Sequence, residues 1–421
     1  MITFSYQNMN SDMKHFSAHI LPTVLVVSII ILILVVLTFS LLDLNSLHYS
    51  HYHFSKQQKY HLDSAIELYC HDSLLLSSLE PDSSCQLYPD DHFSKVYYGM
   101  SQWGLYECLD VANYNKKISK KKLFGKHIEN KFKASFWINN RNRALSISGQ
   151  TKLEGKLYVP GGGINYINVN SSYYSGDLIP DSIIRVSENE LPKLDSLNMM
   201  YIENLINQTS HKAFETLRKE DQLSNSFDNN ARYLLAKDDL ENIHLSGKLI
   251  LVGNELTIFP SANIKDIILI CSKVTIKEGF WGSLQIFARD SAIIENDVFL
   301  SFPSGIYIHG DSCQSYLRMG NHSSIDGYAI IMNKIENDEL HSNFKMDANA
   351  MIRGLLYVDG SAEINGCVKG ATYINDCFYK PNEEYFYAAT LYDAKICRDD
   401  YFPYPLFFEG SYTRREIKLL H

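Results

Sequence analysis

Five charged residues between positions 266 and 297 are the best candidates for catalysis in this sequence: Asp266, Arg289, Asp290, Glu295 and Asp297. Two carboxylates in one cleft can serve as general acid and general base, which is the usual chemistry of glycoside hydrolysis. Asp266, Asp290 and Asp297 are therefore the candidate catalytic residues, with Arg289 as a basic partner. The alternative is that these charges face water at the corners of a regular structure, where charged side chains are common.

Other catalytic and cofactor motifs are missing from the sequence. It contains no G-x-S-x-G, H-E-x-x-H or Cys/His signature, and the glycine triplet at 161–163 lacks the Lys-Ser/Thr of a phosphate loop. His48 and His51 are three residues apart and could share a metal ion, but no carboxylate or cysteine completes a ligand set. We therefore expect no cofactor and no metal, and the balance favours a protein that is not an enzyme.

The eight cysteines include no C-x-x-C pair, which argues against zinc ribbons and thioredoxin-like motifs. If the chain is exported, Cys70 and Cys85 could form a disulfide that closes a short loop, and Cys367 with Cys377 is a second sequence-near pair. The alternative is that most of these thiols are buried as small apolar side chains.

The elements that would position the candidate carboxylates belong to a repeat of about 18 residues over 247–301. Within each unit the apolar residues alternate, which is the spacing of β-strands, and no unit this short can bury its own apolar side. Stacked units share one core, so we predict a parallel, right-handed β-helix, a β-solenoid. The residues expected to stack in successive coils are Ile258, Ile276 and Ile294, and Leu251, Leu269 and Ile286.

The form G-x-L-x-V-x-G occurs at 155–161 and 354–360, and it returns at 247–253 with Leu251 in place of the Val; its glycines suit the sharp corners of a coil. After residue 301 the spacing widens. The matches expected there are Ile306 and Ile308 with Ile330 and Met332, and Leu317, Met319 and Ile325 with Phe344, Met346 and Ile352.

Residues 20–42 carry no charge and are rich in Ile, Leu and Val. About 20 such residues in a helix cross the hydrocarbon core of a bilayer, so this segment is predicted to be an uncleaved single-pass anchor. Lys14 precedes it, while Lys56 and Lys59 follow it, so the positive charges do not decide the orientation. We expect a short tail inside and the large domain outside, because long domains translocate largely regardless of charge.

The remaining segments follow from local pattern. The predicted order is a tail, the membrane helix, a juxtamembrane helix, a small antiparallel β region leading into the solenoid, a helical and loop insertion, the solenoid and an aromatic cap, at 1–19, 20–42, 43–85, 86–180, 181–242, 243–380 and 381–421. The insertion is expected because residues 191–220 have helical apolar spacing and an Asn- and Asp-rich stretch follows. The cap is expected because an open solenoid end exposes strand edges.

The net charge of −9 excludes a generally basic surface, so nucleic acid is not an expected partner. One lysine-rich run, at 116–126, could contact anionic headgroups or an acidic polymer. More often such a run is a solvated loop or a sheet edge protected by charge.

Two resemblances can be drawn. The stretch GLLYVDGSAEINGCVKGATYIN, at 354–375, resembles the short repeats of bactofilins, which are polymer-forming bacterial β-helix proteins. The stretches TKLEGKLYVPGGGIN, SYYSGDLIPDSI, LPKL, DIILICSKVTIKEGF and PSGIYI resemble a set of uncharacterised single-pass membrane proteins of Bacteroidetes-type bacteria. These resemblances imply a bacterial envelope protein whose soluble domain lies on the periplasmic side of a bacterial inner membrane. They provide no catalytic residues that could be assigned in this chain.

The first functional hypothesis is a membrane-anchored structural or interaction protein that binds a protein partner, cell-wall material or another copy. The alternative is a carbohydrate-active enzyme on the same β-helix scaffold. A pilin-like assembly role is a minor alternative that rests on the anchor helix and small sheet alone, since no Gly processing site precedes the span and no Glu stands in its early turns.

Overall fold

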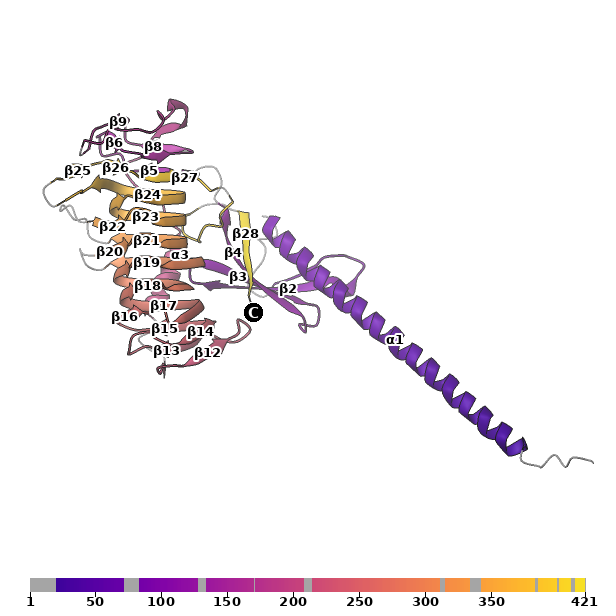
Figure 1. Ribbon diagram of the computed structural model, residues 1–421. Helices are drawn as coiled ribbons and strands as arrows, with labels where there is room; N and C mark the ends of the chain where they lie inside the picture. The colour runs from indigo at the N-terminus through magenta and orange to yellow at the C-terminus, as the bar shows by residue number, and fades with distance from the viewer. Residues whose placement is uncertain are drawn as a thin grey trace, which may run out of the picture. The chain divides into compact units, whose positions relative to one another are not determined.

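The computed structural model describes residues 20–71, 83–127, 134–169, 171–207, 214–310, 315–333, 342–382, 385–399, 401–409 and 413–420. It contains a long helix, a small antiparallel sheet and a solenoid of parallel strands (Figure 1). The chain divides into two compact units, residues 1–61 and 62–421, which are described separately.

Helix α1 runs without interruption from Ile20 to His71. Its apolar N-terminal part is long and apolar enough to cross a membrane, and the side chains there are exposed, as a lipid-facing surface requires. The predicted membrane and juxtamembrane helices are thus one helix in the structure. The second ends earlier than the expected residue 85, because Ser84–Gln86 form strand β1. The predicted tail at 1–19 lies outside the described residues.

The small sheet is antiparallel, with the strand order β1-β2-β3-β4-β28. Its other strands are β2 (Lys95–Trp103), β3 (Tyr106–Asn113), β4 (Ser119–His127) and the C-terminal β28 (Thr413–Leu420). The last turns of α1, residues 62–71, pack against this sheet through Leu62, Ile66 and Tyr69, which are buried. Residues 413–420 were predicted to be part of a solenoid cap. In the structure they belong to the antiparallel sheet instead.

Cys70 and Cys85 both pack against the apolar cluster between α1 and the sheet, and both are free thiols in the structure. Burial raises the pKa of Cys70 to about 11, with a further contribution from Glu67. Cys377 is fully buried inside the solenoid core, whereas Cys367 is only partly buried, and both of these are free as well. The structure thus has free thiols where the sequence suggested disulfides.

The lysine run on β4 is held by ion pairs. Lys120 contacts Asp63, Lys121 contacts Asp110 and Asp228, and Lys122 contacts Glu416, at distances of 2.5 to 3.1 Å. These partners come from α1, the neighbouring strand, the solenoid and β28. The lysines thus link the sheet to its surroundings instead of forming a solvated loop.

A buried lysine in the same strand provides a pH-dependent test of the fold. The Lys126 side chain is 3% exposed; its ammonium donates a hydrogen bond to the carbonyl oxygen of Phe408 at 2.9 Å and lies 3.6 Å from Asp195. Burial lowers the pKa of Lys126 to about 8. In the unfolded chain the pKa of lysine is about 10.4, so unfolding takes up a proton between these values.

We therefore expect the free energy of unfolding of the wild-type protein to increase as the pH is raised from about 8 to about 10, relative to that of the Lys126→Met variant. The variant has no charge to bury, so it lacks this contribution. Chemical denaturation of both proteins at several pH values measures the difference. Two curves that stay parallel across this range would show that Lys126 does not titrate as the burial implies.

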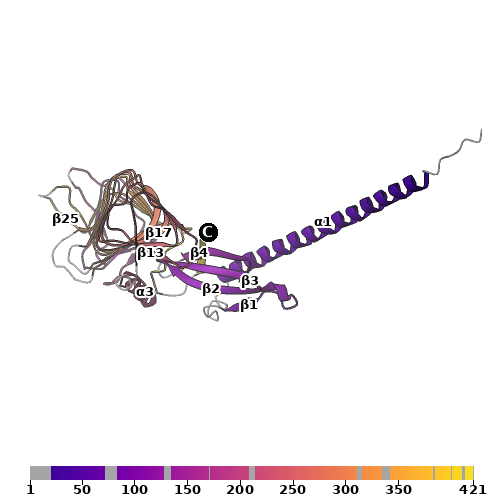
Figure 2. The same cartoon turned by 90° about the horizontal axis from the view of Figure 1, so that it is seen from below.

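Each solenoid coil has three strand segments, which stack into three faces (Figure 2). In the coil of β17 (Asn263–Ile276), for example, residues 263–265 lie on the first face, 267–271 on the second and 273–276 on the third. The other strands of this region are β14 (His244–Gly247), β15 (Leu249–Val252), β16 (Glu255–Ile258), β18 (Trp281–Ile294), β19 (Phe299–Gly310), β20 (Tyr316–Met319), β21 (Ser324–Asn333), β22 (Ser342–Met346), β23 (Met351–Ile364) and β24 (Cys367–Tyr379).

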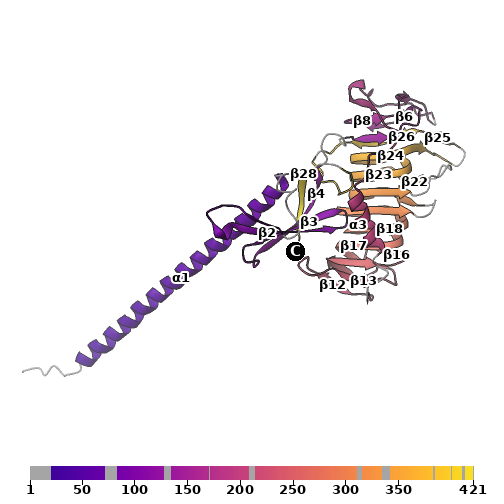
Figure 3. The same ribbon diagram turned by 180° about the vertical axis from the view of Figure 1, so that it is seen from behind.

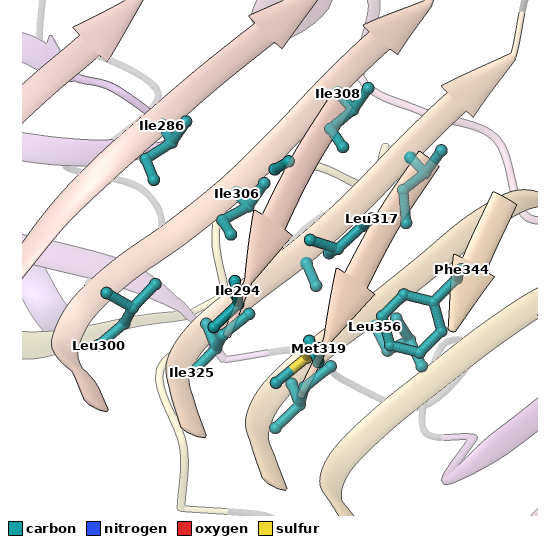
Figure 4. Close-up of a cluster of buried hydrophobic side chains, with 14 of the residues drawn as sticks. Ile286, Ile294, Leu300, Ile306, Ile308, Leu317, Met319, Ile325, Phe344 and Leu356 are labelled. Atoms are coloured by element: carbon teal, nitrogen blue, oxygen red, sulfur yellow. The ribbon is translucent and has the colours of Figure 1, made fainter. Parts of the chain in front are cut away.

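The predicted stacking of the core is confirmed. Ile276 pairs in register with Ile258 in one neighbouring coil and with Ile294 in the other, and all three are at most 1% exposed. The core continues through the wider coils, and Figure 4 shows Leu317, Met319 and Phe344 there. Leu317 and Met319 pair with Phe344 and Met346 as expected. One match was wrong by a residue, because Ile306 and Ile308 pair with Ala329 and Ile331.

The order of the coils differs from the order of the sequence. The sequence had predicted that the β region at 86–180 leads into the first coil of the solenoid. In the structure the segment that begins at residue 134 stacks on the last coil, since β5 (Phe136–Ile138) pairs with residues 372–374 of β24. The strands that extend this end are β6 (Leu145–Ser148), β7 (Lys152–Leu153), β8 (Leu157–Val159), β9 (Ile164–Tyr166), β10 (Ile184–Val186), β25 (Tyr387–Ala388), β26 (Thr390–Tyr392) and β27 (Lys395–Cys397). The segment at 385–399, expected to be part of a cap, is thus built into the coils.

The opposite end of the solenoid is formed by residues 214–242, which the sequence had placed in an insertion. Its strands are β11 (Glu215–Thr216), β12 (Gln222–Asn225) and β13 (Arg232–Leu235), and they pair in parallel with β13, β14 and β15. Helix α3 (Ser196–Asn207) confirms the helix predicted within 191–220, but that prediction extended too far, since Glu215–Thr216 form strand β11. It lies along the solenoid between the two ends (Figure 3), and its Ile202 and Ile206 join the apolar cluster on the second face.

The outer side of the second face is a second core. Side chains from the sheet, α3 and residues 402–408 cover it, and aromatic residues such as Tyr307, Tyr357 and Tyr373 are buried there. Gln285 fixes the sheet to this face: its amide oxygen accepts hydrogen bonds from Leu105 N and the Tyr328 hydroxyl, both at 2.9 Å, and its amide nitrogen donates to Trp103 O.

Candidate functional site

Asp266 lies at the corner between the first and second faces, where it holds other parts of the chain in place. Its carboxylate accepts a hydrogen bond from Ser283 Oγ at 2.9 Å and pairs with Lys418 of β28. Its backbone carbonyl accepts a hydrogen bond from the indole of Trp103 at 3.2 Å. These contacts occupy the carboxylate and tie β28 and the β2 hairpin to the solenoid.

The other candidate carboxylates point to different corners. Asp290 lies between the second and third faces, and Asp297 lies between the third face and the first face of the next coil. Glu295 pairs with Lys277 at 2.6 Å, and this contact lowers the pKa of Glu295. Asp266, Asp290 and Asp297 therefore occupy three different corners, and the structure does not bring them together as a catalytic group.

The surroundings of Asp266 also lack a substrate cleft. A pocket lined by Asp266, Trp103, Gln285 and Lys418 has room for about one water molecule. Among the residues that the structure describes, no group of three or more His, Cys, Asp or Glu is placed to hold a metal ion. The carbohydrate-active hypothesis thus gains no site from its predicted residues.

A polar cluster that the sequence did not reveal joins an early solenoid segment, residues 139–143, to a late one, residues 359–376. Asp376, whose side chain is 6% exposed, pairs with Arg143 and lies 3.7 Å from Arg141. Next to it, the amide of Asn375 bridges Asn139 in one coil and Asp359 in the other. Since each buried charge has a partner across the junction of 134–148 with 354–379, the cluster is best explained as a structural clamp.

The most distinctive surface is the end coil, residues 164–186. Val186 pairs in register with the buried Val159, and Tyr166 pairs with the buried Ile147, so both occupy positions that face the core in the coil beneath. Because no further coil among the residues that the structure describes covers them, Val186 is 66% exposed and Tyr166 is 40% exposed. Strands β9 and β10 are the outermost strands of their sheets, with no partner among the described residues on the outer edge.

The connecting segment of the end coil covers the core only in part. Tyr174, Ile179 and Ile183 pack against it, whereas Tyr173 is 74% exposed and Leu178 is 76% exposed. An open strand edge beside exposed apolar side chains is a typical interaction surface.

The opposite end of the solenoid has a different character. Its partly buried Leu217 and Leu223 pack against the core, and the exposed side chains around them are polar or charged. Glu215 and Arg232, for example, form an ion pair at 2.6 Å. None of the large hydrophobic residues described between 214 and 242 is exposed. As far as the structure describes the two solenoid ends, the end coil is thus the apolar one.

No protein-family model matches this chain, and no curated protein or solved structure matches it either. The resemblance to bactofilins and to single-pass Bacteroidetes-type proteins thus stays a prediction from sequence.

Proposed function

We propose that this protein is a membrane-anchored structural protein of the bacterial envelope whose solenoids associate in pairs through their end coils. The observation that carries the proposal is the open end coil, where core-facing positions such as Val186 are exposed beside unpaired strand edges. Burying such side chains and pairing such edges both favour association.

The difference between the two ends favours a closed pair over a filament. A head-to-tail filament would join the end coil to the opposite end, which is polar and carries charges such as Glu215 and Arg232. An apolar surface is best matched by another apolar surface, and two copies related by a two-fold axis bring the end coil onto itself. We therefore expect dimers that do not grow further.

The anchor supports the membrane part of the proposal. Residues 20–42 of α1 would cross the bilayer once and hold the solenoid on the outer side of the bacterial inner membrane. A second copy in the same membrane is then available as a partner, and confinement to one surface raises its effective concentration.

The test is the oligomeric state of the full-length chain in detergent micelles, measured by analytical ultracentrifugation over a range of protein concentrations. Replacing Leu178 and Val186 together by aspartate is expected to weaken dimerisation at least about tenfold, because both charges would lie in the contact. Thr216→Asp, at the opposite end, is the matched control and should leave the dimer unchanged. A wild-type chain that stays monomeric, or a dimer that survives the double substitution, would overturn the proposal.

A further inference from the structure

The first face of the solenoid carries an exposed pair of aromatic side chains. Trp281 is 74% exposed and Phe299 is 47% exposed, and the two residues pair in register on neighbouring parallel strands, β18 and β19. Their side chains therefore project from the same side of the sheet, about 4.8 Å apart along the solenoid axis. The other two tryptophans, Trp103 and Trp137, are buried, so Trp281 differs from them in having its ring in solvent.

Polar side chains surround the aromatic pair. In the same outward-facing rows, Asn263 and Lys265 lie one coil before Trp281. Asp326 lies one coil after Phe299, where it pairs with Arg353 at 3.3 Å, and burial raises the pKa of the Asp326 carboxyl. The surface thus offers aromatic rings with hydrogen-bond donors and acceptors on both sides.

The apolar area of Trp281 and Phe299 is small, which favours a sugar chain over a protein as the partner. A stable protein interface buries about 800 Å² on each partner around an apolar centre, whereas here charged side chains lie one coil away on either side, the exposed Lys265 before and the partly buried Asp326 after. A sugar chain has the matching character, since each pyranose ring has an apolar C–H face and hydroxyl groups at its rim. In an extended β-1,4-linked glycan the rings recur at a spacing close to that of neighbouring strands, so consecutive rings can lie over Trp281 and Phe299.

We infer that the first face binds an extended, neutral β-1,4-linked glycan through stacking on Trp281 and Phe299, with hydrogen bonds to the polar side chains beside them. This binding site is separate from the end coil and requires neither dimerisation nor catalysis. It would attach the anchored solenoid to a polysaccharide layer.

Trp281 itself reports on the binding. Acrylamide quenches the fluorescence of exposed tryptophans, so in the full-length chain in detergent most of the quenching comes from Trp281. The β-1,4-linked hexasaccharide of N-acetylglucosamine should lower the quenching constant at least about twofold, because a stacked sugar shields the ring. Maltohexaose, an α-linked chain that is curved, should give little protection.

The variants separate binding from a general surface effect. Phe299→Ala keeps the reporter and should weaken the binding of the hexasaccharide at least about fivefold. Tyr316→Ala removes a 37% exposed aromatic residue on the third face and should leave binding unchanged. An absence of protection, equal protection by both sugars, or protection by phosphatidylglycerol vesicles in place of the hexasaccharide would overturn the inference. The charged variants of the end coil should bind the sugar normally, so this test and the dimerisation test can fail independently.

Discussion

Replacing Ile276 by alanine is expected to lower the free energy of unfolding by about 2–5 kcal/mol. Ile276 is fully buried and lies in register between Ile258 and Ile294, so the truncated side chain leaves a cavity bounded by both neighbouring coils. Coils on either side are fixed by their own strand pairing, which limits how far they can collapse into the space. Chemical denaturation followed by circular dichroism measures the loss.

The matched control for Ile276 is its neighbour on the outer side of the same strand. Thr275→Ala should change the free energy of unfolding by no more than about 0.5 kcal/mol, because this side chain points away from the core. Lys277 is a poorer control, since its ion pair with Glu295 can itself contribute up to about 1 kcal/mol. Equal losses for Ile276→Ala and Thr275→Ala would contradict the stacked core.

The repeat could be predicted from sequence because it is local. Each coil of 18 residues brings chemically similar residues to the same position, as with Leu251, Leu269 and Ile286, and the pattern is visible without knowing the fold. The form G-x-L-x-V-x-G, together with its variant at 247–253 that has Leu in place of Val, likewise marks second-face strands, at 157–159, 249–252 and 354–358. Where coils vary in length, the sequence does not show which residue of the next coil a given residue pairs with, because a shift of one residue still matches apolar residues. Ile306 was therefore matched to Ile330 when it pairs with Ala329.

The order of the coils could not be predicted, because the pairing that decides it is remote in sequence. Phe136 pairs with Thr372, more than half the chain away, and neither residue carries a local signal for the other. Residues 214–242 were assigned to an insertion because their coil contains many Asn and Asp residues and few apolar ones. That composition is suited to a coil at the end of a solenoid, where one side faces water.

The candidate carboxylates illustrate a similar limit. Asp266, Asp290 and Asp297 are close in sequence, but a three-faced coil sends residues at its three corners in different directions. By contrast, Trp281 and Phe299 are 18 residues apart and come together because that interval is one coil. This interval is the same as that of the core repeat, and it applies equally to the residues whose side chains point outward. The end coil had no such signal, since its exposure depends on which segment is stacked last.

A column of glycines at the corner between the first and second faces should be as sensitive to substitution as the core. Gly327, Gly354 and Gly370 pair in register in successive coils, and Gly354 has a φ of 128°, a conformation that L-residues with side chains rarely adopt. A Cβ atom at Gly354 would lie 1.9 Å from the carbonyl oxygen of Gly327 and 2.6 Å from the ring of Phe402.

Gly354→Ala is therefore expected to lower the free energy of unfolding by about 2–5 kcal/mol, the combined cost of backbone strain and overpacking. Gly161→Ala is the matched control: its Cβ would meet one atom, of Asn140, at 3.9 Å, and its cost should stay within about 0.5 kcal/mol. Thermal and chemical denaturation of the two variants compare them directly. A Gly354→Ala protein as stable as Gly161→Ala would mean that the coils can separate at this corner, and that the close approach of their backbones is not what holds the second face together.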